Sequence, residues 1–271
     1  MKNILVPTNF SECADYATQV AISLAAKNNA IISFLHIMPN PNDTWHIPRP
    51  ANLSTKSQEK VQARNNLALL VKKASEAGVL AKQFLVFDKG NEKIENYIDP
   101  LGIDFIVMGS HGATGIREMV LGSNTQRTLR HAHVPVLVVK HSPNKPFQIK
   151  NIVFASSFEG NDLGALKLIT DMARLWQATL NVLFITMQDK QQPVNQQKII
   201  DQLQANNPSL KITSSSIEVN DEEWGIHQFA KLIDADIITL TTHDHHGVLV
   251  QRNVAEELAN HEDLPVLVIH S

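Results

Sequence analysis

The stretch Met108-Gly109-Ser110-His111-Gly112 is followed, after nine further residues, by Gly122-Ser123-Asn124-Thr125. It lies between an apolar run at 103–108, which predicts a buried strand, and a helix-like run at 124–131. Glycines have no Cβ, so the backbone can approach a ligand closely, and the N–H groups that begin a helix attract anions. Three glycines and a serine in this setting therefore predict a phosphate cradle.

Composition limits the class of protein. The chain has 271 residues, enough for two domains, of which 43% are apolar and 19% charged. A net charge of −3 favours neither nucleic acid nor an anionic membrane as a partner. The sequence shows no signal-peptide pattern after Met1 and no apolar run near the roughly 20 residues that span a bilayer. One cysteine, Cys13, excludes an intramolecular disulfide, and we predict a cytoplasmic protein.

The chain repeats itself. The run NILVPTNFS at 3–11 is echoed by NIVFASSFE at 151–159, and PVLVV at 135–139 is echoed by PVLVI at 265–269. Self-similarity on this scale predicts tandem domains rather than a solenoid. The polar stretch 141–146, with two prolines, is the natural linker. We therefore predict an N-terminal domain at 1–141 and a C-terminal domain at 149–271.

Short apolar runs alternate with helical patterns in both copies. Ser11 is the expected N-cap of a first helix whose apolar stripe includes Ala14, Ala17 and Leu24, and a second helix is expected over 58–77 with Gly78 as its stop. In the first copy the expected strands are continuous apolar runs, typical of strands buried on both faces, at 4–6, 31–37, 84–87, 103–108 and 136–139. The second copy repeats the pattern, with strands expected from 152 onward and at 182–185, 212–219, 237–240 and 266–269. This alternation predicts an α/β fold with parallel sheets.

Ligands of open α/β sheets bind outside the carboxyl ends of the strands, at the point where the strand order reverses. The glycine motif follows the fourth expected strand, and Pro7-Thr8-Asn9 follows the first. If these two strands are neighbours, both loops face one crevice. Two separate loops would then form opposite sides of one nucleotide site.

These residues resemble the universal stress protein family in its tandem form. Its nucleotide-binding members carry Gly-x2-Gly-x9-Gly-Ser/Thr after the fourth strand, which Gly109, Gly112, Gly122 and Ser123 match. The opening run 4–12, Leu35-His36-Ile37 and the run 135–139 are also similar to the family's strands. The resemblance implies two Rossmann-like domains of the adenine nucleotide alpha hydrolase type, each a five-stranded parallel sheet of order 3-2-1-4-5. It also implies ATP as the usual ligand.

Carried over to this chain, the resemblance assigns a nucleotide site. The phosphates would be held by Gly112, Gly122, Ser123, Asn124 and Thr125. Met108 and Gly109 would line the ribose and base, and Pro7, Thr8 and Ile37 the adenine. The family usually has aspartate where this chain has Asn9, which keeps one acceptor oxygen but replaces the other by a donor.

The second copy departs further from the family pattern. Opposite the quartet at 109–112 it has Thr241-Thr242-His243-Asp244, and opposite Gly122-Ser123 it has Arg252-Asn253. Because Asp244 places a negative charge where phosphate would sit, we predict that this copy does not bind ATP in the family manner. Its expected role is to pair with the first copy, through the fifth-strand edges as in the family.

Several features of the sequence allow more than one interpretation. His111 and Arg117 either contact ligand or belong to an ordinary surface loop, and Cys13 is either an inert helix cysteine or a redox sensor. The insertion 39–56, with four prolines, is a lid, an interface patch or a surface excursion. The cluster His243, Asp244, His245 and His246 is either a polar loop or a metal site completed by a distant histidine such as His227, His261 or His270.

The function expected from the sequence is binding of ATP or a related adenine nucleotide, with Mg²⁺ or Mn²⁺ as a possible companion, and action through nucleotide-dependent conformation or association. A homodimer is a further possibility. One alternative is a weak ATPase, although the chain has no Gly-x4-Gly-Lys-Ser/Thr loop and no lysine in the cradle. Another is an interaction scaffold that has lost nucleotide binding through Asn9.

Overall fold

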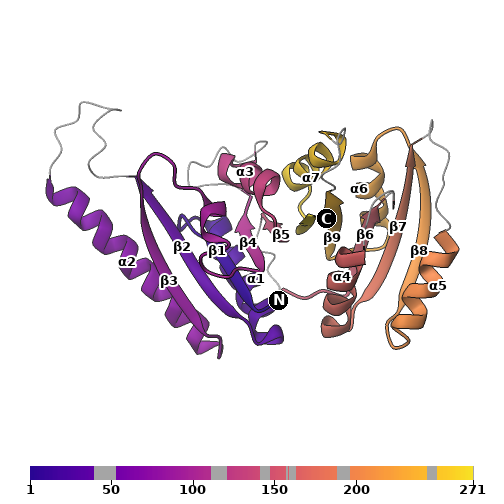
Figure 1. The fold of residues 1–271 in the computed structure, drawn as a ribbon, viewed down its shortest axis with the longest axis horizontal. Helices are drawn as coiled ribbons and strands as arrows, with labels where there is room; N and C mark the ends of the chain where they lie inside the picture. Colours follow the sequence, from indigo (N-terminus) through magenta and orange to yellow (C-terminus); the bar gives the residue numbers. More distant parts are fainter. Residues whose placement is uncertain are drawn as a thin grey trace.

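The computed structural model describes residues 1–39, 53–110, 121–140, 147–156, 158, 163–187, 196–242 and 249–270. Ten strands form one continuous sheet with helices on both faces (Figure 1). We call residues 1–140 the N-terminal copy and residues 147–270 the C-terminal copy. The linker predicted at 141–146 and most of the insertion at 39–56 lie outside the described residues.

The elements alternate as the sequence predicts. In the N-terminal copy they are β1 (Asn3–Pro7), α1 (Glu12–Asn28), β2 (Ile31–Pro39), α2 (Leu53–Glu76), β3 (Ala81–Asp88), the 3₁₀ helix η1 (Ile94–Tyr97), β4 (Phe105–Gly109), α3 (Ser123–His131) and β5 (Val136–Val139). In the C-terminal copy they are β6 (Asn151–Ser156), α4 (Leu163–Trp176), β7 (Thr179–Met187), α5 (Gln196–Asn206), β8 (Ile212–Val219), α6 (Glu222–Leu232), β9 (Ile237–Thr242), α7 (Leu249–His261) and β10 (Val266–His270).

The strand order is β3-β2-β1-β4-β5-β10-β9-β6-β7-β8. Each copy therefore has the predicted order 3-2-1-4-5, with all strands inside a copy parallel. The two copies meet where β5 pairs antiparallel with β10, with Leu137 opposite Leu267. The first and fourth strands are neighbours in each copy, which brings the loops after β1 and β4 to the same edge of the sheet.

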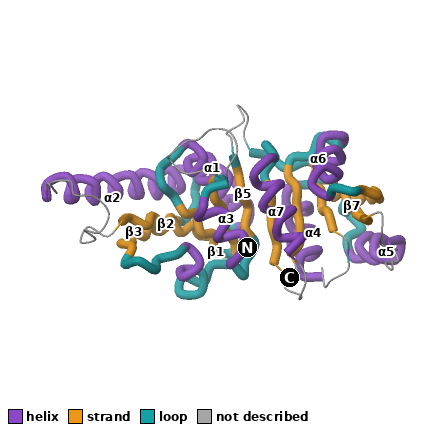
Figure 2. The backbone as a smooth tube through the Cα atoms, turned by 90° about the horizontal axis from the view of Figure 1, so that it is seen from above, coloured by secondary structure: helices purple, strands orange, loops and turns teal. Residues whose placement is uncertain are grey.

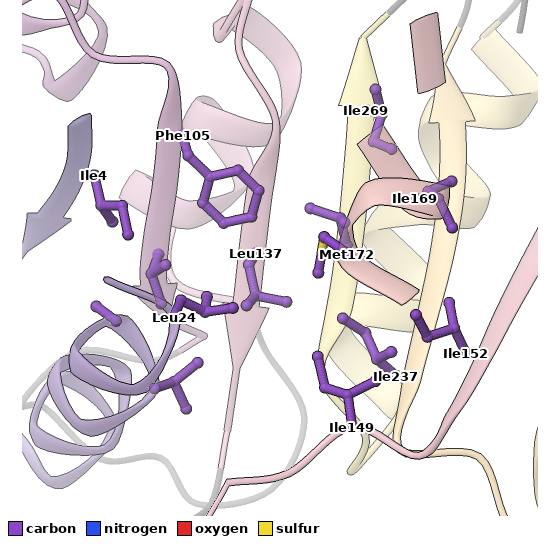
Figure 3. Close-up of a cluster of buried hydrophobic side chains, with 14 of the residues drawn as sticks. Ile4, Leu24, Phe105, Leu137, Ile149, Ile152, Ile169, Met172, Ile237 and Ile269 are labelled. Carbon is purple, nitrogen blue, oxygen red and sulfur yellow. The ribbon is translucent and has the colours of Figure 1, made fainter. Parts of the chain in front are cut away.

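Two apolar layers hold the sheet. One layer lies between the sheet and α1, α2, α4 and α5, and the other lies between the sheet and η1, α3, α6 and α7. Successive residues of β1 point to opposite faces, so Ile4 and Val6 belong to the first layer and Leu5 belongs to the second. The first layer crosses the junction between the copies, where Leu137 and Met172 belong to the same cluster (Figure 3). The core is thus shared between the copies.

Local sequence explains the helix ends. The Ser11 side chain accepts a hydrogen bond from the Ala14 N–H, as expected of an N-cap, and the predicted stripe of α1 is buried. Gly78 has a φ of +74° just beyond α2, consistent with its predicted role as a stop. The expected start of α2 at residue 58 was wrong, because the helix already begins at Leu53 and extends along the outer side of the N-terminal copy (Figure 2). Val61 of this helix is 55% exposed and does not join the core.

The repeat extends to side-chain detail. The Asp104 carboxylate accepts hydrogen bonds from the Lys2 and Asn3 N–H groups at 2.7 and 3.1 Å. In the C-terminal copy the Asp236 carboxylate accepts from the Lys150 and Asn151 N–H groups, at 2.6 and 2.8 Å. Each aspartate thus fixes the start of its copy's central strand, which supports the alignment of the two copies.

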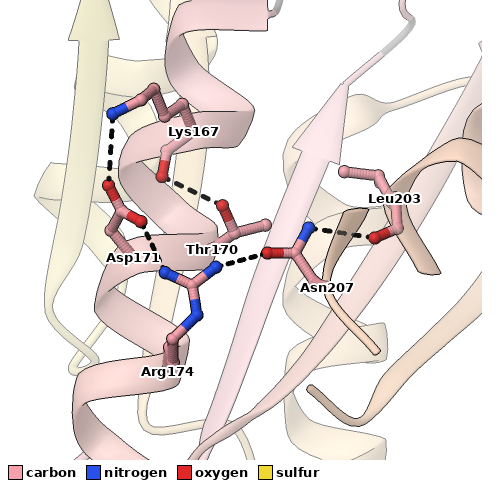
Figure 4. A network of polar contacts seen from close by, with 6 residues as sticks. All are labelled: Lys167, Thr170, Asp171, Arg174, Leu203 and Asn207. Atoms are coloured by element: carbon pink, nitrogen blue, oxygen red, sulfur yellow. Dashed lines mark hydrogen bonds and ion pairs between the residues drawn. The ribbon is translucent and has the colours of Figure 1, made fainter. Parts of the chain in front are cut away.

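A polar network joins α4 to the end of α5 on the outer part of the C-terminal copy (Figure 4). Arg174 donates to the Asp171 carboxylate at 2.8 Å and to the Asn207 side-chain oxygen at 2.5 Å. Asn207 in turn donates to the Leu203 carbonyl oxygen at 2.9 Å, which satisfies a carbonyl in the last turn of α5. Among the described helices, none has the length and apolar character needed to cross a membrane.

Candidate nucleotide site in the N-terminal copy

A cavity of about 230 Å³ lies at the carboxyl ends of β1, β2 and β4. This is the position where the chain turns to opposite sides of the sheet after β1 and β4, as expected for a ligand site of an open α/β fold. Its volume is close to the lower end of the range typical of small-molecule sites, about 300–1,000 Å³. The lining residues are Pro7, Thr8, Asn9, Ala14, Leu35, His36, Ile37, Ile94, Met108, Gly109, Gly122, Ser123, Asn124 and Thr125.

The structure gathers the predicted residues around this cavity. Every predicted site residue that the structure describes is among those that line it, while His111, Gly112 and Arg117 lie outside the described residues. Sequence reasoning missed Ala14, Leu35, His36 and Ile94. His36 carried a usable signal, because it stands between Leu35 and Ile37 at the end of a strand that was already assigned to the site. Ile94 had none, because η1 is too short to show a period.

The first turn of α3 forms the polar wall of the cavity. Gly122 is the N-cap residue with φ −59° and ψ 141°, and no side chain among the described residues caps this helix. Gly122 donates its own N–H to the Ser110 carbonyl oxygen at 2.8 Å, and the first intrahelical bond runs from Gln126 N–H to the Gly122 carbonyl. The N–H groups of residues 123–125 precede that bond, so the helix itself supplies no acceptor for them. An anion in the cavity would meet these donors and the positive end of the helix.

Gly109 has a packing role that the sequence did not reveal. A Cβ at this position would lie 2.8 Å from the Cys13 Cβ and 2.9 and 3.0 Å from the Cys13 carbonyl carbon and oxygen. The end of β4 therefore touches the first turn of α1, and only glycine fits there without displacement. Neither Gly109 nor Gly122 is among the described glycines with positive φ, so close approach rather than left-handed backbone explains the glycine at position 109. The Gly109 carbonyl also accepts a hydrogen bond from the Thr125 hydroxyl at 2.9 Å, which ties α3 to β4.

The loop after β1 forms a compact turn beside the cavity. Phe10 has a φ of +61°, uncommon for a bulky residue, and its N–H donates to the Thr8 hydroxyl at 3.1 Å. The side-chain oxygen of Asn9 accepts from the Ser11 N–H at 3.1 Å. Because that bond engages the oxygen of the amide, the NH₂ group is the part of Asn9 that remains to donate to a ligand.

His36 joins this loop to β2. Its Nδ1 lies 2.6 Å from the Thr8 carbonyl oxygen, and its ring is tilted against Phe10 with centroids 4.5 Å apart. A carbonyl oxygen only accepts, so Nδ1 carries the proton and Nε2 of the neutral ring is an acceptor. The Thr8 carbonyl and the Phe10 ring thus orient the ring of His36, which lines the cavity.

A charged pair flanks the cradle. The Nε atom of Arg127, one turn beyond Ser123, lies 3.5 Å from an oxygen of Glu95, the residue that follows the lining Ile94. Nearby, burial and a hydrogen bond to Glu92 raise the pKa of Tyr97 to about 12. The described lining itself contains no carboxylate and no lysine.

Comparison with known proteins agrees with this fold. The model of the universal stress protein family matches residues 1–140, just over half of the chain. The chain belongs to the universal stress protein family. A universal stress protein of Methanocaldococcus jannaschii is 29% identical over 153 residues, which cover 51% of this chain and 94% of that protein. Universal stress protein YxiE of Bacillus subtilis is 27% identical over 144 residues, or 51% and 97% of the two chains.

The two-copy arrangement also occurs in a solved structure of the family. A universal stress protein from Archaeoglobus fulgidus superposes with a TM-score of 0.79 at 18% identity, covering 99% of this chain and 98% of the other. At this identity the likeness shows the fold alone.

The corresponding crevice of the C-terminal copy is much smaller. Its cavity measures about 30 Å³ and is lined by Ala155, Ser156, Ile185, Glu222, Ile226, Leu240, Thr241 and Val254. Phe158, which follows β6, repeats the geometry of Phe10 in the N-terminal copy, because it has a φ of +57° and its N–H donates to the Ser156 hydroxyl at 2.9 Å. Phe184 stands where the N-terminal copy has His36 and lies against Phe158 with centroids 4.7 Å apart. The loop geometry therefore survives without the larger cavity.

The helix that should carry the second cradle also differs. Helix α7 begins at Leu249, so Arg252 and Asn253 lie within it, whereas the corresponding Gly122 and Ser123 begin α3. The cluster His243, Asp244, His245 and His246 lies outside the described residues. Among the residues the structure does describe, no group of three or more His, Cys, Asp or Glu side chains is arranged to hold a metal ion. His227 and His261, suggested as distant ligands, lie against the Glu262 and Glu223 carboxylates.

Proposed function

We propose that this universal stress protein binds ATP, or a related adenine nucleotide, in its N-terminal copy and acts in the stress response through nucleotide-dependent conformation or association. The observation that carries the proposal is the N terminus of α3, which no described side chain caps and whose first residues line a cavity at the switch point of the sheet. In this proposal residues 122–125 hold the phosphates, together with Gly112, which lies outside the described residues.

The chemistry of the lining fits a nucleotide. One wall is apolar, with Ile37, Ile94 and Met108, and suits a purine base. The lining also presents backbone N–H groups of the first turn of α3 and the Ser123 hydroxyl, and this part suits phosphates. Asn9 and His36 also line the cavity and add polar groups that suit the base edge or the ribose.

A divalent cation would be held differently from the nucleotide. Because the described lining has no carboxylate, Mg²⁺ or Mn²⁺ would bind through phosphate oxygens with hydroxyl or amide oxygens such as those of Ser123 and Asn124. The same lining offers no obvious group to activate water, so the described residues give no support to the weak-ATPase alternative. We therefore favour a binding role.

The Gly122→Asp variant tests the proposal. It places a side chain and a negative charge at the start of α3, and two like charges at about 4 Å repel by roughly 4 kcal/mol near a protein surface. ATP affinity measured by calorimetry should fall about a hundredfold or more. Gly164→Asp is the matched control, because Gly164 lies exposed in the first turn of α4 with no atom near its Cβ position. Equal ATP affinity in both variants would refute the phosphate assignment.

The C-terminal copy has a different role in this proposal. Its smaller cavity and altered helix start support the prediction that it does not bind ATP in the family manner, and that it acts by pairing with the N-terminal copy. A single cysteine leaves no intramolecular disulfide and fits a reducing compartment, so we also propose a cytoplasmic location.

A further inference from the structure

Helix α3, which carries the proposed phosphate cradle, has little apolar packing of its own. It has nine residues, and its buried side chains are Thr125, Thr128 and Leu129. Helices this short are marginal in water without tertiary contacts. The position of its N terminus therefore depends strongly on polar contacts from neighbouring elements.

The strongest of these contacts comes from the C-terminal copy. Glu256 of α7, which is 9% exposed, accepts hydrogen bonds from Arg130 Nε at 2.5 Å and Arg130 Nη2 at 2.8 Å. It also accepts one from Gln126 Nε2 at 2.8 Å, only one turn from the cradle residue Ser123. Burial alone would raise the pKa of Glu256, but the bonds from Arg130 and Gln126 and the Arg130 charge hold that pKa below its usual value. Helices α3 and α7 lie side by side at the junction in both views (Figures 1 and 2).

The contact is built from non-identical partners. Leu137 pairs with its repeat equivalent Leu267, so equivalent positions of the two copies face each other across the junction. In the same alignment Gln126 corresponds to Glu256, and Arg127 corresponds to Glu257. At these two positions α3 carries a neutral and a basic side chain where α7 carries two acidic ones. A second N-terminal copy in the place of the C-terminal copy would offer Gln126 and Arg130 no carboxylate.

We propose that Glu256 is a positioning residue of the nucleotide site, so that the C-terminal copy completes the site of the N-terminal copy. This inference rests on the proposed nucleotide binding. Glu256 is not among the residues that line the cavity. Its bonds to Gln126 and Arg130 fix the orientation of α3, and this orientation keeps the N–H groups of residues 123–125 directed into the cavity. Ordering of α3 by a nucleotide must then favour the Arg130–Glu256 contact to the same extent, because the coupling of two events is reciprocal.

The experiment compares Glu256→Gln with Glu257→Gln in the full chain. Both changes remove one negative charge from α7, but Glu257 is exposed. Lys140→Met is a second control, because Lys140 donates to the Asn260 carbonyl oxygen of α7 across the junction. Nucleotide-free proteins are titrated with ATP by calorimetry, and hydrogen exchange of α7 amides is measured with and without ATP.

We expect Glu256→Gln to bind ATP about fivefold or more weakly than the unchanged chain, at the low end of typical coupling between sites. The Glu257→Gln and Lys140→Met variants should stay within about twofold of the unchanged chain. ATP should slow exchange in α7 of the unchanged chain and have much less effect in Glu256→Gln. A double variant, Arg130→Gln with Glu256→Gln, should be little weaker than Glu256→Gln alone, because both remove one interaction.

The outcomes separate this inference from the proposed function. If the unchanged chain does not bind ATP, the proposed function fails and the inference falls with it. If the unchanged chain binds ATP and Glu256→Gln binds equally well, only the role of Glu256 is overturned. If Lys140→Met weakens binding as much as Glu256→Gln, the effect reports general loosening of the junction, and the positioning role is also rejected.

Discussion

Replacing Gly109 by alanine tests whether the first glycine of the motif is required for packing. The added Cβ would lie 2.8 Å from the Cys13 Cβ and 2.9 Å from the Cys13 carbonyl carbon. Carbon atoms in contact prefer about 3.5–4.0 Å, so β4 and α1 must separate by several tenths of an ångström. Overpacking of this kind typically costs about 1–3 kcal/mol. For a chain of this size each kcal/mol lowers Tm by about 2–4 °C, so we expect Tm to fall by about 2–12 °C.

Urea and thermal unfolding in the absence of nucleotide measure this cost directly. Gly164→Ala is the matched control, because a Cβ there meets nothing within 4 Å, and an alanine in a helix is about 0.5–1 kcal/mol more favourable than glycine. Cys13→Gly should not rescue Gly109→Ala, since the carbonyl carbon and oxygen of residue 13 remain in the way. A Gly109→Ala protein as stable as the unchanged chain would refute the packing role. Rescue by Cys13→Gly would show that the clash involves only the Cys13 side chain and not the backbone of residue 13.

Three further outcomes are expected. Thr125→Val removes the hydroxyl that donates to the Gly109 carbonyl at 2.9 Å, so the free energy of unfolding in urea should fall by about 1–2 kcal/mol, and Thr125→Ser should recover most of it. Asp236→Asn weakens the two bonds that begin β6 and should cost about 1–2 kcal/mol in the same assay; an unchanged urea midpoint would contradict that role. Tyr97 has a folded-state pKa raised to about 12, and burial also raises the pKa of Tyr16, the other tyrosine. The neutral form of Tyr97 therefore stabilises the fold fully below its unfolded pKa of about 10, and this stabilisation is lost as pH rises toward 12. In a pH titration, tyrosinate absorbance of the folded protein should rise at a higher pH than that of the unfolded chain.

The sequence predicted those parts of the fold that follow from local patterns. The continuous apolar runs marked the strands, Ser11 marked the start of α1, and Gly78 marked the end of α2. Each of these signals depends on residues close together in the chain. The earlier start of α2 was missed because its first turns carry no apolar period.

The candidate site was predictable where a motif or a strand end identified it, as for residues 7–9 and 122–125. What remained hidden depends on residues that meet only after folding. Three contacts of this kind join segments that are distant in the sequence: Gly109 packs against Cys13, His36 bonds to the Thr8 carbonyl, and Glu256 accepts a hydrogen bond from Gln126 of α3. No local period or spacing reports such contacts, so the chemistry around the cradle needed the structure.

The most direct test of the account is a calorimetric titration of nucleotide-stripped, full-length protein with ATP in the presence of Mg²⁺. Binding with one ATP per chain is the predicted result, because one copy has the open cradle and the larger cavity. No heat of binding at millimolar ATP would contradict the nucleotide site and favour an interaction scaffold. Two ATP molecules per chain would contradict the assignment of a silent C-terminal copy.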